Sequence, residues 1–257
     1  MSPEKLGQHF LTDLSWQERI ARAIHPDAGV WVEIGAGHGE MTKRLARHAR
    51  KVLAVEIDSR LARRLREVTA DCKNVEVIES DVMAVDFAKL TAGEQFSVYG
   101  NLPYYITSPI LHRLFEHAER IDVIHIVIQF EVAVRIVAQP GRRDYGYLSV
   151  LSQWFSRPEI VFRIPPGAFR PPPKVASALV TFRMPGAREK YTLEDETSFF
   201  DFVKECFAQK RKTLRNNLRA RLGTRTEEVL REAGLPLDVR AEQITVSQFA
   251  ALFRVAF

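Results

Sequence analysis

Short apolar segments alternate with longer helix-like segments through the first two-thirds of the chain, and this alternation constrains the fold more than any other feature. The apolar, β-branched segments are Val30–Ile34, Val52–Val55, Val75–Ile78, Phe96–Tyr99 and Ile121–Ile128. The segments between them, such as Glu40–Ala49 and Ser59–Ala70, have the character of helices. Strands that alternate with helices at this spacing form a parallel sheet with crossover helices. The sequence therefore predicts an α/β fold.

The sequence also indicates where the first helix begins and where the last strand of this pattern lies. Ser15 is followed three residues later by Glu18, a spacing typical of a capping box, so the first helix is predicted to begin there. The proline-rich stretch 165–174 cannot be helical. Ala178–Arg183 is predicted to be the last strand.

The remainder of the chain differs in character. From Tyr191 onward the periodicity is helical and no strand pattern recurs. A chain of 257 residues is long enough for one large and one small domain. We therefore expect an α/β domain at residues 1–183 and a small all-helical domain at residues 184–257. Cys72 and Cys206 are far apart and form no metal-binding spacing, so we expect no structural metal.

Composition and charge exclude few classes of protein. The net charge is +5 and the isoelectric point about 9.3, values that are compatible with a polyanionic partner but do not establish one. No apolar stretch reaches the roughly 20 residues of a transmembrane helix. The first ten residues contain no apolar segment of a signal peptide. We therefore expect a cytoplasmic protein without a membrane partner.

A glycine-rich turn follows the first predicted strand of the sheet. Gly35, Gly37 and Gly39 form a GxGxG pattern between that strand and a helix-like segment. Glycines at such a turn let the backbone approach a ligand where a Cβ atom would collide. The pattern lacks the third glycine of the GxGxxG turn, which binds the pyrophosphate of a dinucleotide. S-adenosylmethionine has no phosphate, so it fits the pattern better than NAD.

Two acidic residues follow the next two strands. Glu56 ends the segment Val52–Val55 and can accept hydrogen bonds from both hydroxyls of a ribose. Asp81 lies just beyond Val75–Ile78 and can accept from an adenine amino group. Singly, each could instead be a solvated acid or a helix cap. Together, at the ends of successive parallel strands, they favour a nucleoside site.

The segment Gly100–Tyr105 lies where open α/β sheets carry their chemistry, at the carboxyl end of a strand. The side-chain oxygen of Asn101 can accept one hydrogen of an exocyclic amino group. Pro103 stiffens the turn, and a backbone carbonyl near it can accept the second hydrogen. Tyr104 offers a ring on which a base can stack. The alternative is a proline turn with an asparagine cap and tyrosines in the core.

These residues resemble a known family. N6-adenine methyltransferases carry the pattern (D/N/S)-P-P-(Y/F) or N-(L/I)-P-Y, which is matched by Asn101–Tyr104. The longer similarity is to the ribosomal RNA adenine dimethyltransferases, the KsgA and Erm group, and it covers nearly the whole chain. The motifs that carry it are GQHFL, EIGAGHGEMT, VEID, ESDV, GNLPYYIT, IQFEVAVRI, YGYLSVLSQ, FRPPPKVASALV and FAQKRKTLRNNL. The resemblance implies a Rossmann-like class I S-adenosylmethionine-dependent methyltransferase domain followed by a small all-helical domain.

The resemblance also implies which residues bind the cofactor. The predicted set is His9, Leu11, Gly35, Gly37, Glu56, Asp81 and Asn101. The segment around His9 and Leu11 is expected to fold over the methionine end of S-adenosylmethionine. Glu56 is expected to hold the ribose, and Asp81 the adenine amino group of the cofactor.

The catalytic residues implied by the resemblance are Asn101, Pro103, Tyr104 and Phe169. Phe169 is expected to face Tyr104, so that the target adenine lies between the two rings. This chain departs from the family at two positions near the site. The family usually has asparagine in place of His9, and often asparagine in place of Tyr105.

A basic segment in the second predicted domain is the candidate surface for RNA. The predicted RNA-binding residues are Lys210, Arg211, Lys212, Arg215 and Arg219. Read as a helix, this segment places Leu214, Leu218 and Leu222 on one stripe and Arg211, Arg215 and Arg219 on a neighbouring one. The leucines would dock on the core and the arginines would contact phosphates. A merely solvated basic face is the alternative.

The leading expectation is dimethylation of two adjacent adenines near the 3′ end of small-subunit (16S) rRNA. The partner would be a precursor of the small ribosomal subunit, and the protein a monomer. Two alternatives stay open: methylation of large-subunit (23S) rRNA, as by Erm enzymes, and an assembly factor that acts mainly by binding. A DNA adenine methyltransferase is disfavoured, because no segment resembles a module that reads a duplex sequence.

Overall fold

The computed structural model describes residues 9–191, 193 and 195–257. Gly7 and Gln8 of the GQHFL motif lie outside the described residues. Two compact units make up the described chain. Of the described residues, those up to 133 and those from 159 to 184 form the first unit, and those from 134 to 158 and from 185 onward form the second.

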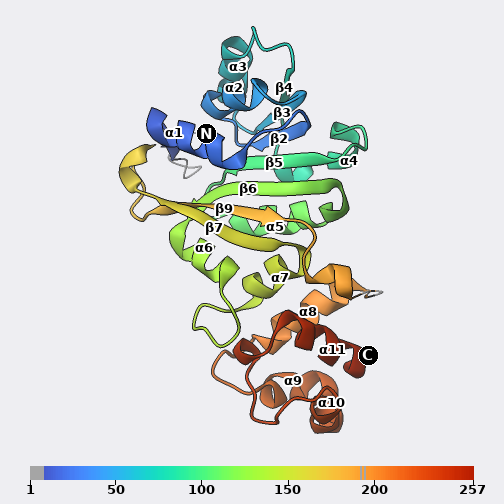
Figure 1. Ribbon diagram of the computed structural model, residues 1–257. Coiled ribbons are helices and arrows are strands. Elements are labelled where there is room, and N and C mark those ends of the chain that lie inside the picture. The colour runs from blue at the N-terminus through green and yellow to red at the C-terminus, as the bar shows by residue number, and fades with distance from the viewer. Residues whose placement is uncertain (1–8, 192, 194) are drawn as a thin grey trace. The chain divides into compact units, whose positions relative to one another are not determined.

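Strands and helices alternate along the first part of the chain (Figure 1). The strands are β1 (Phe10–Leu11), β2 (Val30–Ile34), β3 (Lys51–Glu56), β4 (Val75–Glu79), β5 (Phe96–Asn101), β6 (Ile121–Gln129), β7 (Arg157–Ile164), β8 (Phe169–Arg170) and β9 (Ser177–Arg183). The helices are α1 (Leu14–Ile24), α2 (Glu40–Ala46), α3 (Ser59–Val68), α4 (Phe87–Leu90), α5 (Thr107–Phe115), α6 (Phe130–Val137), α7 (Tyr147–Phe155), α8 (Glu196–Cys206), α9 (Leu214–Leu222), α10 (Thr226–Glu232) and α11 (Val246–Ala256).

The central sheet has seven strands in the order β4-β3-β2-β5-β6-β9-β7. The pairs from β4 to β6 are parallel, as predicted, but β9 runs antiparallel to β6, so the sheet is mixed rather than wholly parallel. The order reverses on either side of β2, which has β3 on one side and β5 on the other. Such a switch point leaves a crevice at the carboxyl ends of the strands, where ligands of open sheets bind.

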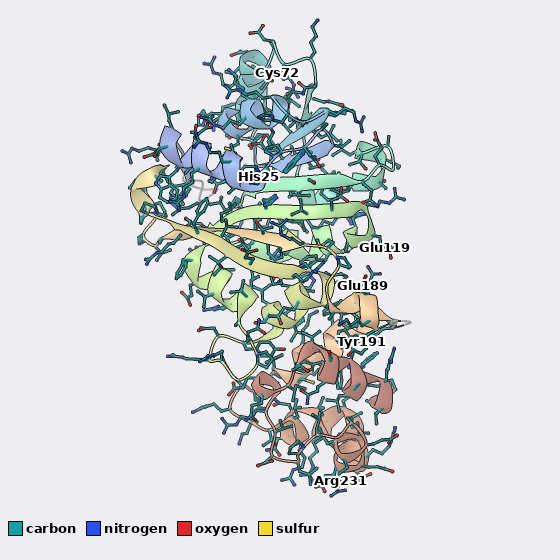
Figure 2. The ribbon with its side chains drawn as sticks, viewed as in Figure 1. His25, Cys72, Glu119, Glu189, Tyr191 and Arg231 are labelled. Atoms are coloured by element: carbon teal, nitrogen blue, oxygen red, sulfur yellow. The ribbon has the colours of Figure 1, made fainter. Side chains whose placement is uncertain are left out.

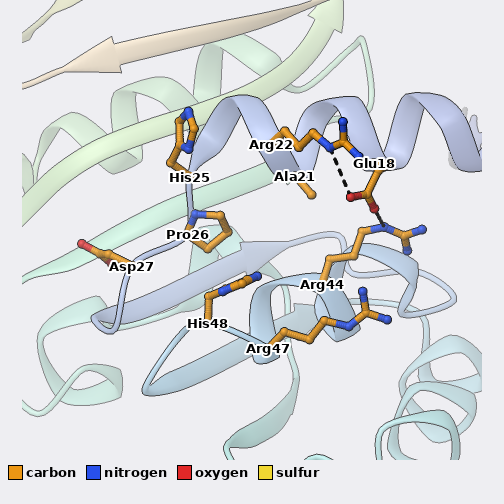
Figure 3. Close-up of a pocket in the computed structure, with 9 residues that line it drawn as sticks. All are labelled: Glu18, Ala21, Arg22, His25, Pro26, Asp27, Arg44, Arg47 and His48. Atoms are coloured by element: carbon orange, nitrogen blue, oxygen red, sulfur yellow. Dashed lines mark ion pairs between the residues drawn. The ribbon is translucent and has the colours of Figure 1, made fainter.

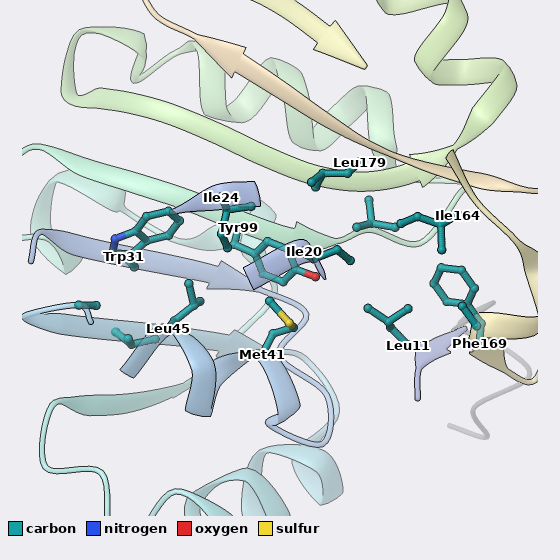
Figure 4. Close-up of a cluster of buried hydrophobic side chains, with 14 residues drawn as sticks. Leu11, Ile20, Ile24, Trp31, Met41, Leu45, Tyr99, Ile164, Phe169 and Leu179 are labelled. Carbon is teal, nitrogen blue, oxygen red and sulfur yellow. The ribbon is translucent and has the colours of Figure 1, made fainter. Parts of the chain in front are cut away.

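Apolar side chains pack on both faces of this sheet. Ile20 of α1, Leu45 of α2 and Trp31 of β2 belong to one buried cluster, which Figure 4 shows in full. On the opposite face, Phe115 of α5 contacts Phe182 of β9 with ring centroids 6.0 Å apart. The covered faces fix the register of the strands and therefore the positions of their carboxyl ends.

The first helix does not begin where the capping-box pattern predicts. The N-cap is Asp13, whose Oδ1 accepts hydrogen bonds from the backbone nitrogens of Ser15 and Trp16 at 2.9 and 3.1 Å. A carboxylate at the N-cap satisfies these donors as well as a serine hydroxyl does. Ser15 therefore lies inside the first turn, with its own hydroxyl bound to Asp13.

The second unit is helical apart from its turns. Along with helices α8 to α11 it contains residues 134–158, which carry the second half of α6, all of α7 and the first two residues of β7. The aromatic ring of Trp154 in α7 packs on Phe199 of α8, with centroids 4.7 Å apart, and its Nε1 donates to Glu196 at 2.8 Å. These contacts explain why the compact units differ from the predicted division at residues 183 and 184. As a division of function, that boundary stays a prediction.

The described part of the chain contains two free cysteines, Cys72 in the first unit (Figure 2) and Cys206 in the second. Among the same residues, no helix has the length and apolar character that a membrane crossing requires.

Candidate active site

The glycine-rich turn after β2 is held in a conformation that favours glycine. Gly35 and Gly37 have φ angles of 71° and 57°, which side chains rarely tolerate. The turn is tied to β3, because the backbone nitrogen of Gly35 donates to the Val55 carbonyl at 2.9 Å. A Cβ atom on Gly37 would lie 3.3 Å from the Phe10 ring. The backbone thus forms a cradle that a side chain would fill.

Glu56 is buried at the end of β3, and its carboxylate binds the backbone of the glycine-rich turn. Its side chain accepts hydrogen bonds from the backbone nitrogens of Gly37 at 2.9 Å and Asp58 at 3.0 Å, one on each carboxylate oxygen. Only 1% of the residue is exposed. Each carboxylate oxygen has a second lone pair, and Glu56 lines the same cavity as Gly35. The residue can therefore both shape the turn and accept from a ligand.

Asp81 caps a 3₁₀ turn at the end of β4, which was the alternative interpretation of this residue. Its Oδ1 accepts from the backbone nitrogen of Met83 at 2.9 Å. The residue is exposed, so its second oxygen can still meet a ligand. Its predicted contact with the cofactor adenine stays a prediction.

Two apolar side chains that the sequence analysis did not single out lie at the same edge of the sheet. Ile57 directly follows Glu56 and is 53% exposed, and Met83 is 37% exposed. Apolar side chains at this edge of the sheet can pack on the flat face of a ligand ring and remove it from water. Their positions after two successive parallel strands could have identified them, because the acids beside them had been identified in this way.

Asn101 is the last residue of β5 and its amide is oriented by the N-terminal segment. Its Nδ2 donates to the His9 carbonyl at 2.9 Å. The side-chain oxygen therefore points away from His9 and is available as an acceptor. Asn101, Pro103 and Tyr104 line one cavity together with His9 and Glu56. The structure thus brings together six predicted residues: His9, Gly35, Glu56, Asn101, Pro103 and Tyr104.

The turn after Asn101 leaves one backbone carbonyl available. The Pro103 carbonyl accepts from the backbone nitrogen of Ile106 at 3.2 Å and from the Thr107 hydroxyl at 3.4 Å. Within the described part of the chain, no donor is bound to the carbonyl of Leu102. The free acceptor beside Pro103 is therefore that of Leu102.

Tyr104 is fixed at its hydroxyl group. The oxygen lies 2.9 Å from Ser177 Oγ of β9. Burial raises the pKa of the Tyr104 phenol, and the hydrogen bond with Ser177 acts in the opposite direction. The phenol therefore stays neutral at physiological pH and offers its ring, rather than a charge, to the cavity.

The N-terminal strand closes over this region. Phe10 and Leu11 pair with Arg170 and Phe169 in a two-stranded antiparallel ribbon. The Phe10 ring meets His38 edge-on, with centroids 4.5 Å apart. This ribbon joins the start of the chain to the FRPPPKV segment.

Leu11 and Phe169 are placed differently from the other predicted site residues. Their side chains lie together in the buried cluster of Figure 4, where Leu11 is 7% and Phe169 0% exposed. Phe169 thus presents no open ring face, and its role opposite Tyr104 stays a prediction.

A second cavity, of about 330 Å³, lies between α1 and α2 (Figure 3). Its lining includes the loop His25–Asp27 before β2 and His48 before β3. These residues are at the amino ends of the strands, the edge opposite to Asn101. Glu18 pairs there with Arg22 and Arg44 at 3.5 and 3.8 Å. This cavity is therefore separate from the candidate active site.

In the second unit, the predicted leucine stripe is confirmed. Leu214, Leu218 and Leu222 of α9 are buried, with at most 9% exposed. The arginine stripe was wrong at one end, because the helix begins at Leu214 and Arg211 lies before it. The five predicted RNA-binding residues are all exposed.

The arginines of α9 are partly neutralised by neighbouring acids. Glu227 of α10 forms ion pairs with Arg215 at 3.2 Å and with Arg231 at 3.0 Å. Arg219 lines the same α9–α10 cavity, of about 570 Å³. No group of three or more histidine, cysteine, aspartate or glutamate side chains suited to a metal ion occurs among residues 9–191, 193 and 195–257.

Comparison with known proteins agrees with this geometry. The family described as "Ribosomal RNA adenine dimethylase" matches residues 3–256. The chain is 43% identical to the ribosomal RNA small subunit methyltransferase A of Koribacter versatilis, over 97% of this chain and 92% of that protein. It is 44% identical to the protein of the same name from Acidobacterium capsulatum, over 97% and 89%.

Two solved structures share the fold over nearly the whole chain. A dimethyladenosine transferase from Plasmodium falciparum superposes with a TM-score of 0.83 at 24% identity, covering 95% of this chain and 96% of that chain. The 23S rRNA methyltransferase ErmE superposes with a TM-score of 0.70 at 29% identity, covering 96% and 98%. The Rossmann-like methyltransferase fold with a helical C-terminal region is therefore confirmed.

Proposed function

Because this chain belongs to the ribosomal RNA adenine dimethylase family, we propose that it dimethylates N6 of two adjacent adenines near the 3′ end of small-subunit rRNA. Membership makes the chain an S-adenosylmethionine-dependent methyltransferase of ribosomal RNA. The proposal concerns the target within that RNA. It is supported by the small-subunit relatives, which are 43% and 44% identical, whereas the large-subunit enzyme ErmE is 29% identical.

The observation that carries the proposed chemistry is the free Asn101 oxygen beside the glycine turn. The side-chain oxygen of Asn101 and the carbonyl of Leu102 are the two available acceptors at the end of β5. An adenine amino group has two hydrogens to donate. Its nitrogen lone pair is delocalised into the ring and is a poor nucleophile. Two acceptors favour a pyramidal nitrogen, whose lone pair can then be directed at an electrophile.

The residues around the turn fit S-adenosylmethionine, which supplies an electrophilic methyl group when bound. We infer that Gly35 and Gly37 admit its methionine end and that Glu56 accepts from its ribose. Asp81 would accept from its adenine amino group, with Ile57 and Met83 covering the faces of that ring. His9 and Leu11 would close over the methionine end.

No strong base is required of the protein. The methylated amino group would be very acidic as an ammonium and would lose its proton readily. Tyr104 and Phe169 are proposed to hold the adenine between them once the Phe169 ring has turned out of the buried cluster that it shares with Leu11. Pro103 would keep the turn rigid. Positioning of the amino group would then account for most of the rate enhancement.

We propose that the helical region at residues 184–257 recognises the RNA. The exposed cations Lys210, Arg211, Lys212, Arg215 and Arg219 support this, because phosphate neutralisation dominates the affinity of proteins for nucleic acids. The substrate would be a precursor of the small ribosomal subunit, in which the adenines can swing out of the RNA stack. The enzyme would act as a monomer in the cytoplasm, where subunits are assembled.

The proposal is tested with S-adenosylmethionine labelled in its methyl group. The full chain is incubated with unmethylated small subunits and, separately, with naked large-subunit RNA, and the labelled nucleosides are identified. N6,N6-dimethyladenosine from the small subunit alone is the expected result. Label in large-subunit RNA alone would contradict the proposal and place the protein beside ErmE. Tight subunit binding without label would indicate an assembly factor.

A further inference from the structure

His9 makes three contacts with residues around the candidate active site. Its backbone carbonyl accepts from Asn101 Nδ2 at 2.9 Å, and its ring Nδ1 lies 2.8 Å from the Pro171 carbonyl oxygen. The ring stacks on Tyr104, with centroids 5.3 Å apart and planes inclined by 29°. Because a carbonyl can only accept, Nδ1 carries the proton and donates to Pro171. The imidazole is thus fixed by one edge and one face.

The place of this ring coincides with the place required for the target adenine. An adenine whose amino group reaches the oxygen of Asn101 must stack on the part of Tyr104 nearest to Asn101. His9 contacts Asn101 through its backbone carbonyl and Tyr104 through its ring, so the ring lies on Tyr104 within one residue of the Asn101 contact. The imidazole is planar, as an adenine is. Both rings cannot occupy the site at once.

The N-terminal strand does not depend on the His9 ring for its position. Phe10 and Leu11 are held by backbone pairing with Arg170 and Phe169. The Leu11 carbonyl also accepts from Gln17 Nε2 at 2.7 Å. Rotation of the His9 side chain would therefore leave the strand in place, and the His9 carbonyl would still hold the Asn101 amide.

We propose that His9 is an internal competitor of the target base: its imidazole occupies the adenine position on Tyr104 in the RNA-free enzyme, and the adenine displaces it. The inference rests on the proposed roles of Asn101 and Tyr104. Replacement of the imidazole by a base is favourable only if the base stacks on Tyr104 more strongly than the imidazole does and also donates a hydrogen bond to Asn101. Because the ring must leave before a base can stack, its presence raises the apparent Kd for the substrate.

The stack itself is tested by nuclear magnetic resonance on the full chain with labelled histidine ring carbons. The protein has seven histidines, and the His9 signal is identified by its loss in His9→Asn. We expect the His9 ring protons to be shifted upfield by the Tyr104 ring current and to lose this shift in Tyr104→Leu. The same His9 shift in the wild-type chain and in Tyr104→Leu would overturn the proposal.

Competition with the adenine is tested by the kinetics of methylation of unmethylated small subunits, with S-adenosylmethionine saturating for each variant. His9→Asn removes the ring and keeps a short polar side chain, whereas His9→Phe keeps a ring that can stack. An aromatic pair contributes enough to expect KM for the subunits to fall about 2- to 10-fold in His9→Asn. In His9→Phe the KM should stay near or above the wild-type value.

Two outcomes separate this inference from the proposed function. An unchanged or raised KM in His9→Asn, with wild-type dimethylation intact, overturns the role of His9 alone. Absence of dimethyladenosine with the wild-type chain overturns the proposed function, and the resonance experiment still decides whether His9 stacks on Tyr104.

Discussion

The candidate active site and the basic surface of α9 use polar groups in opposite ways. At the active site, Glu56 is 1% exposed and both of its carboxylate oxygens accept from backbone nitrogens, while the Asn101 amide is oriented by one hydrogen bond. On α9, Arg215 and Arg219 are exposed, and Arg215 shares an acid with Arg231. The first region contains few groups, each oriented by hydrogen bonds, and the second contains several exposed charges.

This difference predicts two kinds of response to mutation. A buried, oriented group has no neighbour that can replace it. Its loss should therefore strongly lower either the rate of methyl transfer or the affinity for the cofactor, and the size of this loss should not depend on salt. An exposed cation is one of several, so its loss should weaken binding in proportion and should depend on ionic strength. Substitutions in each region test this contrast.

The largest effect is expected for Asn101→Ala. Loss of one positioned acceptor at the reacting amino group should lower kcat by about 10²- to 10³-fold, the range seen when one transition-state hydrogen bond is removed. Subunit binding, measured by co-sedimentation, should remain within about threefold, since the phosphate contacts are untouched. Gln95→Ala, an exposed amide just before the same strand, is the matched control. Turnover of Asn101→Ala at the rate of that control would exclude the proposed role.

A smaller effect is expected for Glu56→Gln. The amide keeps the shape of the side chain but has only one acceptor oxygen, so it cannot accept from both Gly37 and Asp58 and also from a ribose. Loss of one or two charge-assisted hydrogen bonds should raise the Kd for S-adenosylmethionine by about 10- to 100-fold, measured by calorimetry.

Glu79→Gln is the matched control for Glu56, because Glu79 is paired in register with it on β4 but is exposed. Its affinity for the cofactor should equal that of the wild-type chain. Equal losses in both variants would show that burial and orientation of Glu56 are unimportant.

Arg215→Glu should weaken RNA binding by about tenfold and reduce the dependence of log K on log salt by about one unit. The new acid would face Glu227, which already pairs with Arg231, so the local repulsion adds to the lost phosphate contact. Affinity for S-adenosylmethionine should not change. Arg64→Glu on α3 is the control, because Arg64 is also exposed and ion-paired. Unaltered RNA affinity in Arg215→Glu would show that α9 is not part of the RNA-binding surface.

The last prediction concerns stability rather than function. Burial raises the pKa of Glu33 to about 8, with the nearby acids Glu40 and Glu56 acting in the same direction. The folded state thus binds a proton that the unfolded state releases near pH 4.5. The contribution of this bound proton to the free energy of unfolding is fully present below about pH 4.5 and is lost as the pH rises through about 8. In Glu33→Gln, which cannot titrate at this position, the Tm measured by calorimetry should fall less between pH 4.5 and 8 than in the wild-type chain. An equally steep fall in both proteins would contradict the raised pKa of Glu33.

Much of the fold could be predicted because its signals are local. The strands from Val30–Ile34 to Ile121–Ile128 were recognised from β-branched runs, and each lies within an observed strand. The site residues at the ends of β3 and β5 followed from the same pattern, since parallel strands present their carboxyl ends at one edge.

The features that escaped prediction depend on distant contacts. Strand β1 has two residues and exists only because residues 169 and 170 pair with it. The burial of Phe169 follows from that same pairing with Leu11. The placement of residues 134–158 in the second unit depends on aromatic packing, such as that of Trp154 on Phe199. No local periodicity contains this information.

The separation of chemistry from RNA binding is tested most directly by the salt dependence of the wild-type steady-state parameters. Methylation of unmethylated small subunits is measured between low and moderate ionic strength, with S-adenosylmethionine saturating. We predict that KM for the subunit rises steeply with salt, because exposed cations carry the binding. The kcat should stay nearly constant, because the groups at Asn101 are buried or oriented. A kcat that falls as steeply as KM rises would contradict the account.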